Sequence, residues 1–184
     1  MKKILFLILA TTLTLHSCSM KETAQPEEKN WEGILRQKLP YLGHRNWIVI
    51  ADLAYPLQSS EGIITLWANE PYESVLGKVK AMINEAPHVF AHVYYDKELS
   101  FIPEEDAPGI TALRRQMEVI CGKEAQSIPH EELISRLDEA GKLFSVVLIK
   151  TPTLIPYTTT FFELDCNYWD ASRASRLEER MKQQ

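Results

Sequence analysis

The sequence predicts an α/β fold, a three-layer sandwich around a mixed, mainly parallel sheet. Residues 47–51 and 144–149 are short, continuous apolar runs, which are typical of strands buried on both faces of a sheet. Segments with apolar residues at helical spacing lie between these runs, and strands that alternate with helices favour helices layered on a sheet. About 150 residues follow a polar N-terminal segment, enough to bury one sizeable core in one domain.

The first half of the chain contains two predicted helices and two predicted strands. A short amphipathic helix covers residues 31–39 and stops at Pro40. Strands follow at 47–51 and 63–67, separated by a polar loop. A second helix covers 71–86, because its apolar residues fall on one stripe, formed by Val75, Val79, Met82 and Ile83.

Three further elements precede the end of the domain. Residues 88–95 are rich in Val, Phe and Tyr and predict a strand, which Phe101 and Ile102 extend as a hairpin. A helix covers 110–121, where apolar residues repeat at helical spacing before a glycine. The next helix covers 129–140 and begins at a proline, a residue that suits the first turn.

Two strands close the predicted domain. They cover 144–149 and 157–164, on either side of a Thr-Pro turn. If the second strand begins at Tyr157, alternate residues place Glu163 and Asp165 on the same face as Tyr157. The alternative is that both acids face solvent at a strand end.

The N-terminus predicts export and a lipid anchor. Residues 1–17 combine two lysines with a short apolar run, which is typical of a signal peptide and too short for a permanent membrane helix. The sequence Leu-His-Ser-Cys resembles the bacterial lipobox, so Cys18 is the predicted lipidation site; the alternative is an ordinary signal cleaved near Ser17. Residues 18–30 are polar and predict a flexible tether. We therefore expect a protein of the bacterial cell envelope, lipid-anchored on the periplasmic or outer surface.

The mature chain is predicted to hold one α/β domain, 31–170, and a charged C-terminal tail, 171–184, which forms a loose helix. The formal net charge is -5 and falls by two, to -7, when Lys2 and Lys3 leave with the signal. A mildly acidic domain without a basic patch does not favour nucleic acid as a partner.

Neither a metal nor an organic cofactor is predicted. The seven glycines form no phosphate-binding loop. His88 and His92 are four residues apart, but their surroundings favour a strand, where this spacing is not that of a helical zinc site. Cys121 and Cys166 could form a disulfide after export or remain thiols, and the sequence leaves both alternatives open.

A histidine and an aspartate flank the first buried strand. His44 precedes residues 47–51, and Asp52 follows them at the carboxyl end, where ligands gather in open α/β sheets. An acid at such a position is costly to bury unless it is paired or used. The alternative is structural: Asp52 caps the turn into Tyr55 and Pro56, and His44 is a loop residue.

Two segments resemble one known family. The run Gly-His-Arg-Asn-Trp-Ile-Val-Ile-Ala-Asp-Leu-Ala-Tyr-Pro is similar to the opening motif of the D-ribose pyranase and L-fucose mutarotase family, with matching positions at Gly43, His44, Asp52 and Pro56. The closing strand and turn are similar as well, with Pro156 and Tyr157 in register. The resemblance spans residues 33–165 and implies the fold of that family.

The resemblance also implies an activity and its residues. It implies a cofactor-independent isomerase that binds a monosaccharide and interconverts its anomers or ring forms. His44 would move the protons, and Asp52 would orient the imidazole or hold sugar hydroxyls. Tyr157 and His130 match further positions that contact the sugar. We expect these groups to surround one hollow, and the family implies a homo-oligomer with sites near subunit contacts.

Some family positions differ in this chain. Asn46 stands where the family has an aspartate, and Thr159 stands where it has an asparagine; both are candidate sugar-binding residues with altered chemistry. Pro152 lies in a turn that holds glycine and glutamate in the family. These differences support an alternative function, a catalytically inactive surface lipoprotein that uses the same scaffold for binding or assembly.

Overall fold

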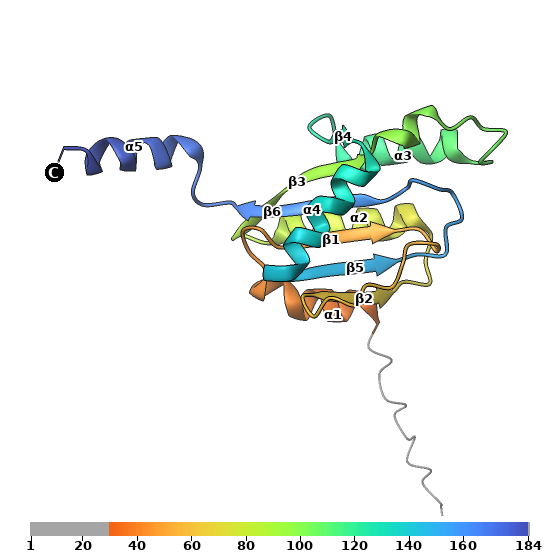
Figure 1. Ribbon diagram of the computed structural model, residues 1–184, viewed down its shortest axis with the longest axis horizontal. Coiled ribbons are helices and arrows are strands. Elements are labelled where there is room, and N and C mark those ends of the chain that lie inside the picture. The colour runs from red at the N-terminus through yellow and green to blue at the C-terminus, as the bar shows by residue number, and fades with distance from the viewer. Residues whose placement is uncertain (1–29, 184) are drawn as a thin grey trace, which may run out of the picture.

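The computed structural model describes residues 30–183, which form a six-stranded sheet with helices on both of its faces (Figure 1). The strands lie in the order β2-β5-β1-β6-β3-β4. Their bounds are β1 (Trp47–Ala51), β2 (Ile63–Trp67), β3 (Val89–Asp96), β4 (Gln126–Ile128), β5 (Val146–Lys150) and β6 (Thr160–Cys166).

Five α-helices and two short 3₁₀ helices connect the described strands or follow them. The α-helices are α1 (Trp31–Lys38), α2 (Tyr72–Glu85), α3 (Ile110–Cys121), α4 (His130–Leu143) and α5 (Ala171–Met181). The 3₁₀ helices are η1 (Leu39–Tyr41) and η2 (Lys97–Phe101). The predicted helices at 31–39, 71–86 and 110–121 are confirmed, and α4 runs three residues beyond its predicted end.

The strand directions define two opposite edges of the sheet. β1 is parallel to β5 and antiparallel to β6, and β5 is parallel to β2. On the other side, β3 is antiparallel to β6 and parallel to β4. All strands except β6 therefore end at one edge, here called the carboxyl edge, and begin at the opposite one, the amino edge. The predicted mixed, mainly parallel sheet is confirmed.

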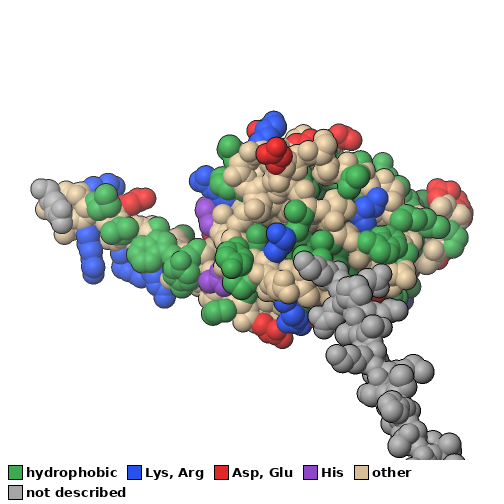
Figure 2. All heavy atoms as spheres, turned by 90° about the horizontal axis from the view of Figure 1, so that it is seen from below, with side chains coloured by type: hydrophobic (Ala, Val, Ile, Leu, Met, Phe, Trp, Pro, Cys, Tyr) green, Lys and Arg blue, Asp and Glu red, His purple; other side chains and the backbone are tan. Residues whose placement is uncertain are grey.

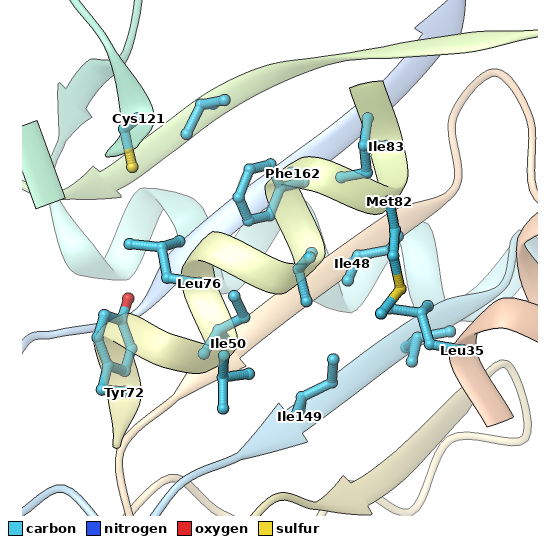
Figure 3. Close-up of a cluster of buried hydrophobic side chains, with 14 of the residues drawn as sticks. Leu35, Ile48, Ile50, Tyr72, Leu76, Met82, Ile83, Cys121, Ile149 and Phe162 are labelled. Atoms are coloured by element: carbon cyan, nitrogen blue, oxygen red, sulfur yellow. The ribbon is translucent and has the colours of Figure 1, made fainter. Parts of the chain in front are cut away.

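One hydrophobic cluster lies on each face of the sheet. The face covered by α1, α2 and α3 includes Ile48, Ile50, Ile149 and Phe162, which pack against α2 (Figure 3). On the other face, α4 packs against residues that alternate with these along the strands, including Val49, Leu148 and Phe161. This confirms the three-layer sandwich.

Burial of β1 on both sides follows from its sequence. All five residues of β1 are buried, because every one of them is apolar and the strand has helices above and below it. Burying one large aliphatic side chain contributes about 1.5–3 kcal/mol, so the central strand holds the layers together.

Between β3 and α4 the chain differs from the prediction. Phe101 and Ile102 do not extend a hairpin: η2 occupies this segment, and Phe101 is exposed. The apolar pair suggested a strand, but Ile102 instead packs against the hydrophobic cluster that includes Leu99. β4 was not predicted, because its three residues, Gln126, Ser127 and Ile128, are mostly polar and exposed at the sheet edge.

The last strand begins later than predicted. β6 starts at Thr160, whereas Tyr157 lies in the preceding turn with a φ angle of 55°. The backbone of Tyr157 is therefore left-handed, and the alternation of side chains along β6 does not extend back to it. Glu163 and Asp165 accordingly do not share a face with Tyr157, and that prediction is wrong.

The C-terminal segment forms α5, which stands away from the rest of the fold (Figure 1). Asp170 caps the start of the helix, because its side chain accepts a hydrogen bond from the backbone N–H of Arg173, and none of the helix residues is buried. Basic and hydrophobic side chains lie along different sides of it (Figure 2). The predicted helix in the charged tail is confirmed.

Several expectations lie outside the described residues. The predicted signal peptide, the lipidation of Cys18 and nearly all of the tether at 18–30 fall on residues that the structure does not describe. Within residues 30–183, none of the helices is both long and apolar enough to cross a membrane.

Two glycines bring the end of α4 against the loop that leads into β2. A Cβ atom on Gly62 would lie 2.3 Å from the carbonyl oxygen of Gly141 and 2.7 Å from that of Phe144. A Cβ atom on Gly141 would lie 2.7 Å from Cδ1 of Ile63. Only glycine therefore fits at these two positions. The atoms that face Gly62 are backbone carbonyl oxygens, which cannot move without shifting the end of α4.

Replacing Gly62 should test this contact. We expect Gly62→Ala to lower the free energy of unfolding by about 1–3 kcal/mol, because the new methyl group overlaps two backbone carbonyls. The matched control is Gly77→Ala within α2, where nothing lies within 4 Å of the new Cβ atom. That variant should be more stable by about 0.5–1 kcal/mol. Urea denaturation measures both, and equal effects of the two substitutions would contradict the contact.

Candidate functional site

The carboxyl edge of the sheet holds a hollow of about 430 Å³ that several candidate residues line. Its volume falls within the range of ligand pockets, about 300–1,000 Å³. The hollow lies where β1 ends, where α4 begins and where the chain turns into β6. Its lining includes Asp52, Tyr55, His130, Pro156 and Tyr157. Three of the predicted site residues, Asp52, His130 and Tyr157, therefore meet at one place.

Asp52 follows β1 directly and has two roles in the geometry. Its Oδ1 accepts hydrogen bonds from the backbone N–H groups of Ala54 and Tyr55, at 2.8 and 3.0 Å. This is the turn-capping arrangement that the structural alternative predicted. Oδ2 has no hydrogen-bond partner among the described residues and remains available at the hollow. The cap thus fixes the carboxylate while one oxygen stays free for a ligand.

Tyr157 and His130 approach each other across the hollow. Their ring centroids are 5.4 Å apart, with an angle of 87° between the ring planes. The backbone N–H of His130 donates to the carboxylate of Glu98, at 3.0 and 3.2 Å, which holds the first turn of α4 in place. An acid at a helix N-terminus is also electrostatically favourable. The hydrogen bond of its backbone to Glu98 and the contact of its ring with Tyr157 therefore hold the His130 side chain in place.

Asp96, which the sequence reasoning missed, lies beneath these residues. It is the last residue of β3 and is fully buried. Its Oδ1 is 3.0 Å from Nδ1 of His130, at ion-pair distance but without the alignment of a regular hydrogen bond. Burial raises the pKa of Asp96 to about 6, although His130 acts to lower it. The sequence did hold a signal for Asp96: like Asp52, it is an aspartate at the carboxyl end of a strand rich in apolar residues.

Thr159 lies close to the site but not at its surface. The side chain is 1% exposed and is not among those that line the hollow. Its neighbour Thr160 pairs with the hydroxyl of Tyr72, at 2.6 Å, inside the core. Thr159 is therefore separated from the surface of the hollow in this conformation.

His44 lies at the amino edge, on the other side of β1 from Asp52. Its Nδ1 is 2.6 Å from Oδ1 of Asp165, at the end of β6. The five residues of β1 span about 17 Å, at roughly 3.3 Å per residue. The expectation that His44, Asp52 and Tyr157 surround one hollow is therefore wrong within a single chain, because a whole strand separates the imidazole from the other two groups.

Asp165 gathers two histidines at the amino edge. Besides His44 at 2.6 Å, it has Nε2 of His92 at 3.4 Å from its Oδ2. Burial acts to raise the pKa of Asp165, but hydrogen bonds from the Cys166 backbone and the two histidines outweigh it, and the net pKa is below its usual value. Histidines gather at the end of the body from which α5 leaves (Figure 2). Asp165 thus supplies a carboxylate to His44 in place of one at position 46.

Asn46 closes the loop that carries His44. Its Oδ1 accepts from the backbone N–H of Gly43, at 2.7 Å, and its Nδ2 donates to the carbonyl of Ser145, at 3.2 Å. Both polar ends of the side chain are engaged, so the structure gives Asn46 a loop-stabilising role at the amino edge, not a place in the hollow.

No metal site is present among residues 30–183, where His, Cys, Asp and Glu side chains form no group of three or more suited to a metal ion. His88 instead places its Nε2 against the carbonyl oxygens of Leu39 and Leu42, at 3.2 and 3.1 Å. Cys121 and Cys166 are both free thiols. Burial raises the pKa of Cys121 to about 11, so that thiol stays protonated at neutral pH.

Comparisons with known proteins agree with this fold. The model of the RbsD / FucU transport protein family matches residues 32–163. The structure of RbsD from Bacillus subtilis, solved in complex with D-ribose, has 18% identity and a TM-score of 0.51, covering 72% of this chain and 91% of its own. The fucose mutarotase of Streptococcus pneumoniae, solved in complex with L-fucose, has 17% identity and a TM-score of 0.50, covering 78% of this chain and 97% of its own. No curated protein matches the chain.

The buried carboxyl group of Asp96 should make the free energy of unfolding depend on pH. In the unfolded chain it ionises near its ordinary pKa of 3.8, whereas in the folded protein it does so near 6. As pH rises between these values the unfolded state loses its proton first, so folded stability falls by up to about 3 kcal/mol. This contribution is present in full below the lower pKa.

Asp96→Asn removes the titrating group and keeps the shape of the side chain. We expect the unfolding free energy of the wild type minus that of Asp96→Asn to fall as pH rises from about 4 to about 6, the window set by the shifted pKa. Urea titrations at each pH measure it, with exposed Asp106→Asn as the control. A difference that stays constant or increases with pH would show that Asp96 is not protonated by its burial.

Proposed function

Because the chain belongs to the RbsD / FucU transport protein family, we propose that it binds a monosaccharide at the carboxyl edge and interconverts its anomers or ring forms. The observation that carries this proposal is the hollow in which Asp52, His130 and Tyr157 meet. Both solved relatives hold a monosaccharide, one D-ribose and the other L-fucose, which supports the same substrate class here.

The chemistry of the hollow suits a sugar. A carboxylate accepts hydrogen bonds from hydroxyl groups, and Oδ2 of Asp52 is free to do so. Tyr157 offers an apolar ring face beside its hydroxyl and is 40% exposed, so a sugar can lie against it. Ring opening needs only a base for the anomeric hydroxyl and an acid for the ring oxygen, and an imidazole can serve either step near neutral pH.

The catalytic role that the family resemblance gives to His44 requires a second copy of the chain. His44 lies at the amino edge, so it can reach a sugar beside Asp52 only if another subunit presents it. We propose that the protein forms a homo-oligomer in which His44 of one subunit faces the hollow of the next. The hydrogen bond between Nδ1 of His44 and Asp165 orients the imidazole, which supports this role.

An inactive binding module is the second candidate function. It is favoured by the engaged side chain of Asn46 and the burial of Thr159, which leave fewer groups free to contact a sugar. In this case the exported, lipid-anchored chain predicted from its N-terminus would hold a sugar or assemble with other copies in the cell envelope without changing the sugar. Binding without acceleration distinguishes this candidate from an isomerase.

Exchange NMR spectroscopy tests the activity. We expect the wild type to accelerate anomer or ring-form exchange of ribose or fucose, and Asp52→Asn to weaken sugar binding by about 10–100-fold, because one charged hydrogen bond contributes about 1.5–3 kcal/mol. Asparagine keeps the oxygen that caps the turn, so the fold is retained. The exposed control Asp106→Asn should behave as the wild type. Exchange at the uncatalysed rate, with sugar bound, would favour the inactive module.

Complementation between subunits tests the shared site. At a sugar concentration well below KM, His44→Ala should be inactive alone, and Asp52→Asn should keep only about 1–10% of the wild-type rate. When the two variants are co-expressed and purified as mixed oligomers, about a quarter of the sites combine an intact His44 with an intact Asp52, if the subunits assemble at random. Activity should recover to about that fraction. Mixed oligomers that stay inactive, or a fully active His44→Ala variant, would refute a site completed by His44 of a neighbouring subunit.

A further inference from the structure

Among residues 30–183, Asp96 is the one charged side chain that is fully buried. It ends β3 at the carboxyl edge, and its closest charged partner is His130, with Oδ1 and Nδ1 3.0 Å apart. We propose that Asp96 is a positioning residue for His130: it holds Nδ1 toward the core and leaves Nε2 facing the hollow, where Nε2 accepts the proton of the sugar's anomeric hydroxyl. The inference rests on the proposed function in taking the hollow as the sugar site.

A purely structural role does not account for Asp96. Other acids of the chain satisfy backbone N–H groups: Asp52 caps a turn, Asp170 caps α5 and Glu104 binds the start of α3. Both oxygens of Asp96, in contrast, are buried without a regular hydrogen-bond partner. A buried, incompletely satisfied carboxylate destabilises a fold, so its presence beneath a ligand-sized hollow indicates use.

The charges around Asp96 leave His130 as its one favourable partner. Glu98 from η2 and Asp52 from the end of β1 both act to raise the pKa of Asp96, as burial does, whereas His130 from α4 acts to lower it. His130 is also the closest of these groups, with its Nδ1 3.0 Å from Oδ1 of Asp96.

The orientation of the imidazole sets which nitrogen can act. With Nδ1 at Asp96, Nδ1 carries the hydrogen in the neutral ring, and Nε2 keeps its lone pair. Nε2 has no hydrogen-bond partner in the part of the chain that the structure describes. The edge contact with Tyr157 and the anchored backbone N–H leave the ring little freedom to turn.

With this tautomer, His130 can act as the base that opens the sugar ring. Nε2 takes the proton from the anomeric hydroxyl, the bond between that oxygen and C1 becomes a carbonyl, and the bond from C1 to the ring oxygen breaks. His44 of the neighbouring subunit, in its protonated form, gives the ring oxygen its proton, and solvent then carries the proton held by Nε2 back to His44. Closure of the ring on the other face of the carbonyl reverses these events and yields the other anomer.

Imidazole ¹⁵N shifts test the orientation without any sugar. At a pH where the rings are neutral, His130 of the wild type should carry its hydrogen on Nδ1; His130→Gln identifies its signals. In Asp96→Asn the amide can donate to Nδ1, and the hydrogen should move to Nε2, as replacing the aspartate of a catalytic triad selects the wrong tautomer. A wild-type His130 with its hydrogen on Nε2 would overturn the proposal, whether or not the variant folds.

Kinetics separate this inference from the proposed function. Asp96→Asn should lower kcat for sugar exchange by at least about 100-fold with KM nearly unchanged, the size of a general acid–base contribution. The exposed variant Asp106→Asn should keep wild-type rates. A wild type without activity refutes the proposed function and leaves the tautomer result standing as the test of orientation. An active wild type with an equally active Asp96→Asn refutes the role of Asp96 alone.

Discussion

The burial of β1 between β5 and β6 determines where each polar side chain of the site can lie. Every residue of this strand is apolar and buried, so polar groups can appear only before it or after it. Asp52 follows the strand and lines the hollow, whereas His44 precedes it and pairs with Asp165. The other strands that run in the same direction also end at the edge of Asp52, including β3 with Asp96. One central strand thereby separates two sets of titratable groups.

Sequence patterns predicted the elements whose packing dictates their composition. Strands 47–51 and 63–67 and helix 110–121 were predicted with the bounds that they have, because their apolar residues follow the buried faces. The matched positions Asp52, His130 and Tyr157 were also found to lie together. Asp52 follows the end of β1, His130 begins α4 and Tyr157 precedes β6, and the pattern of alternating strands and helices already implies the directions of these elements.

The sequence did not predict features that depend on contacts across the fold. The left-handed backbone at Tyr157 shifts the start of β6, and no local pattern marks it. Convergence of His44 with Asp52 was assumed from a shared motif, although a buried strand lies between them. Asp96 was missed because its importance arises from His130, which is 34 positions away in the chain and comes close only through the pairing of β3 with β4.

The contact between Gly62 and Gly141 couples the packing at one end of α4 to the position of its other end. His130 stands at one end of this helix and Gly141 near the other, about 16 Å away at 1.5 Å per residue. Because backbone touches backbone at the far end, a small change in residue size there would tilt the helix axis and displace the imidazole at the near end. Substrate preference can then be tuned during evolution from a position that no sugar touches, without altering any group that performs the chemistry.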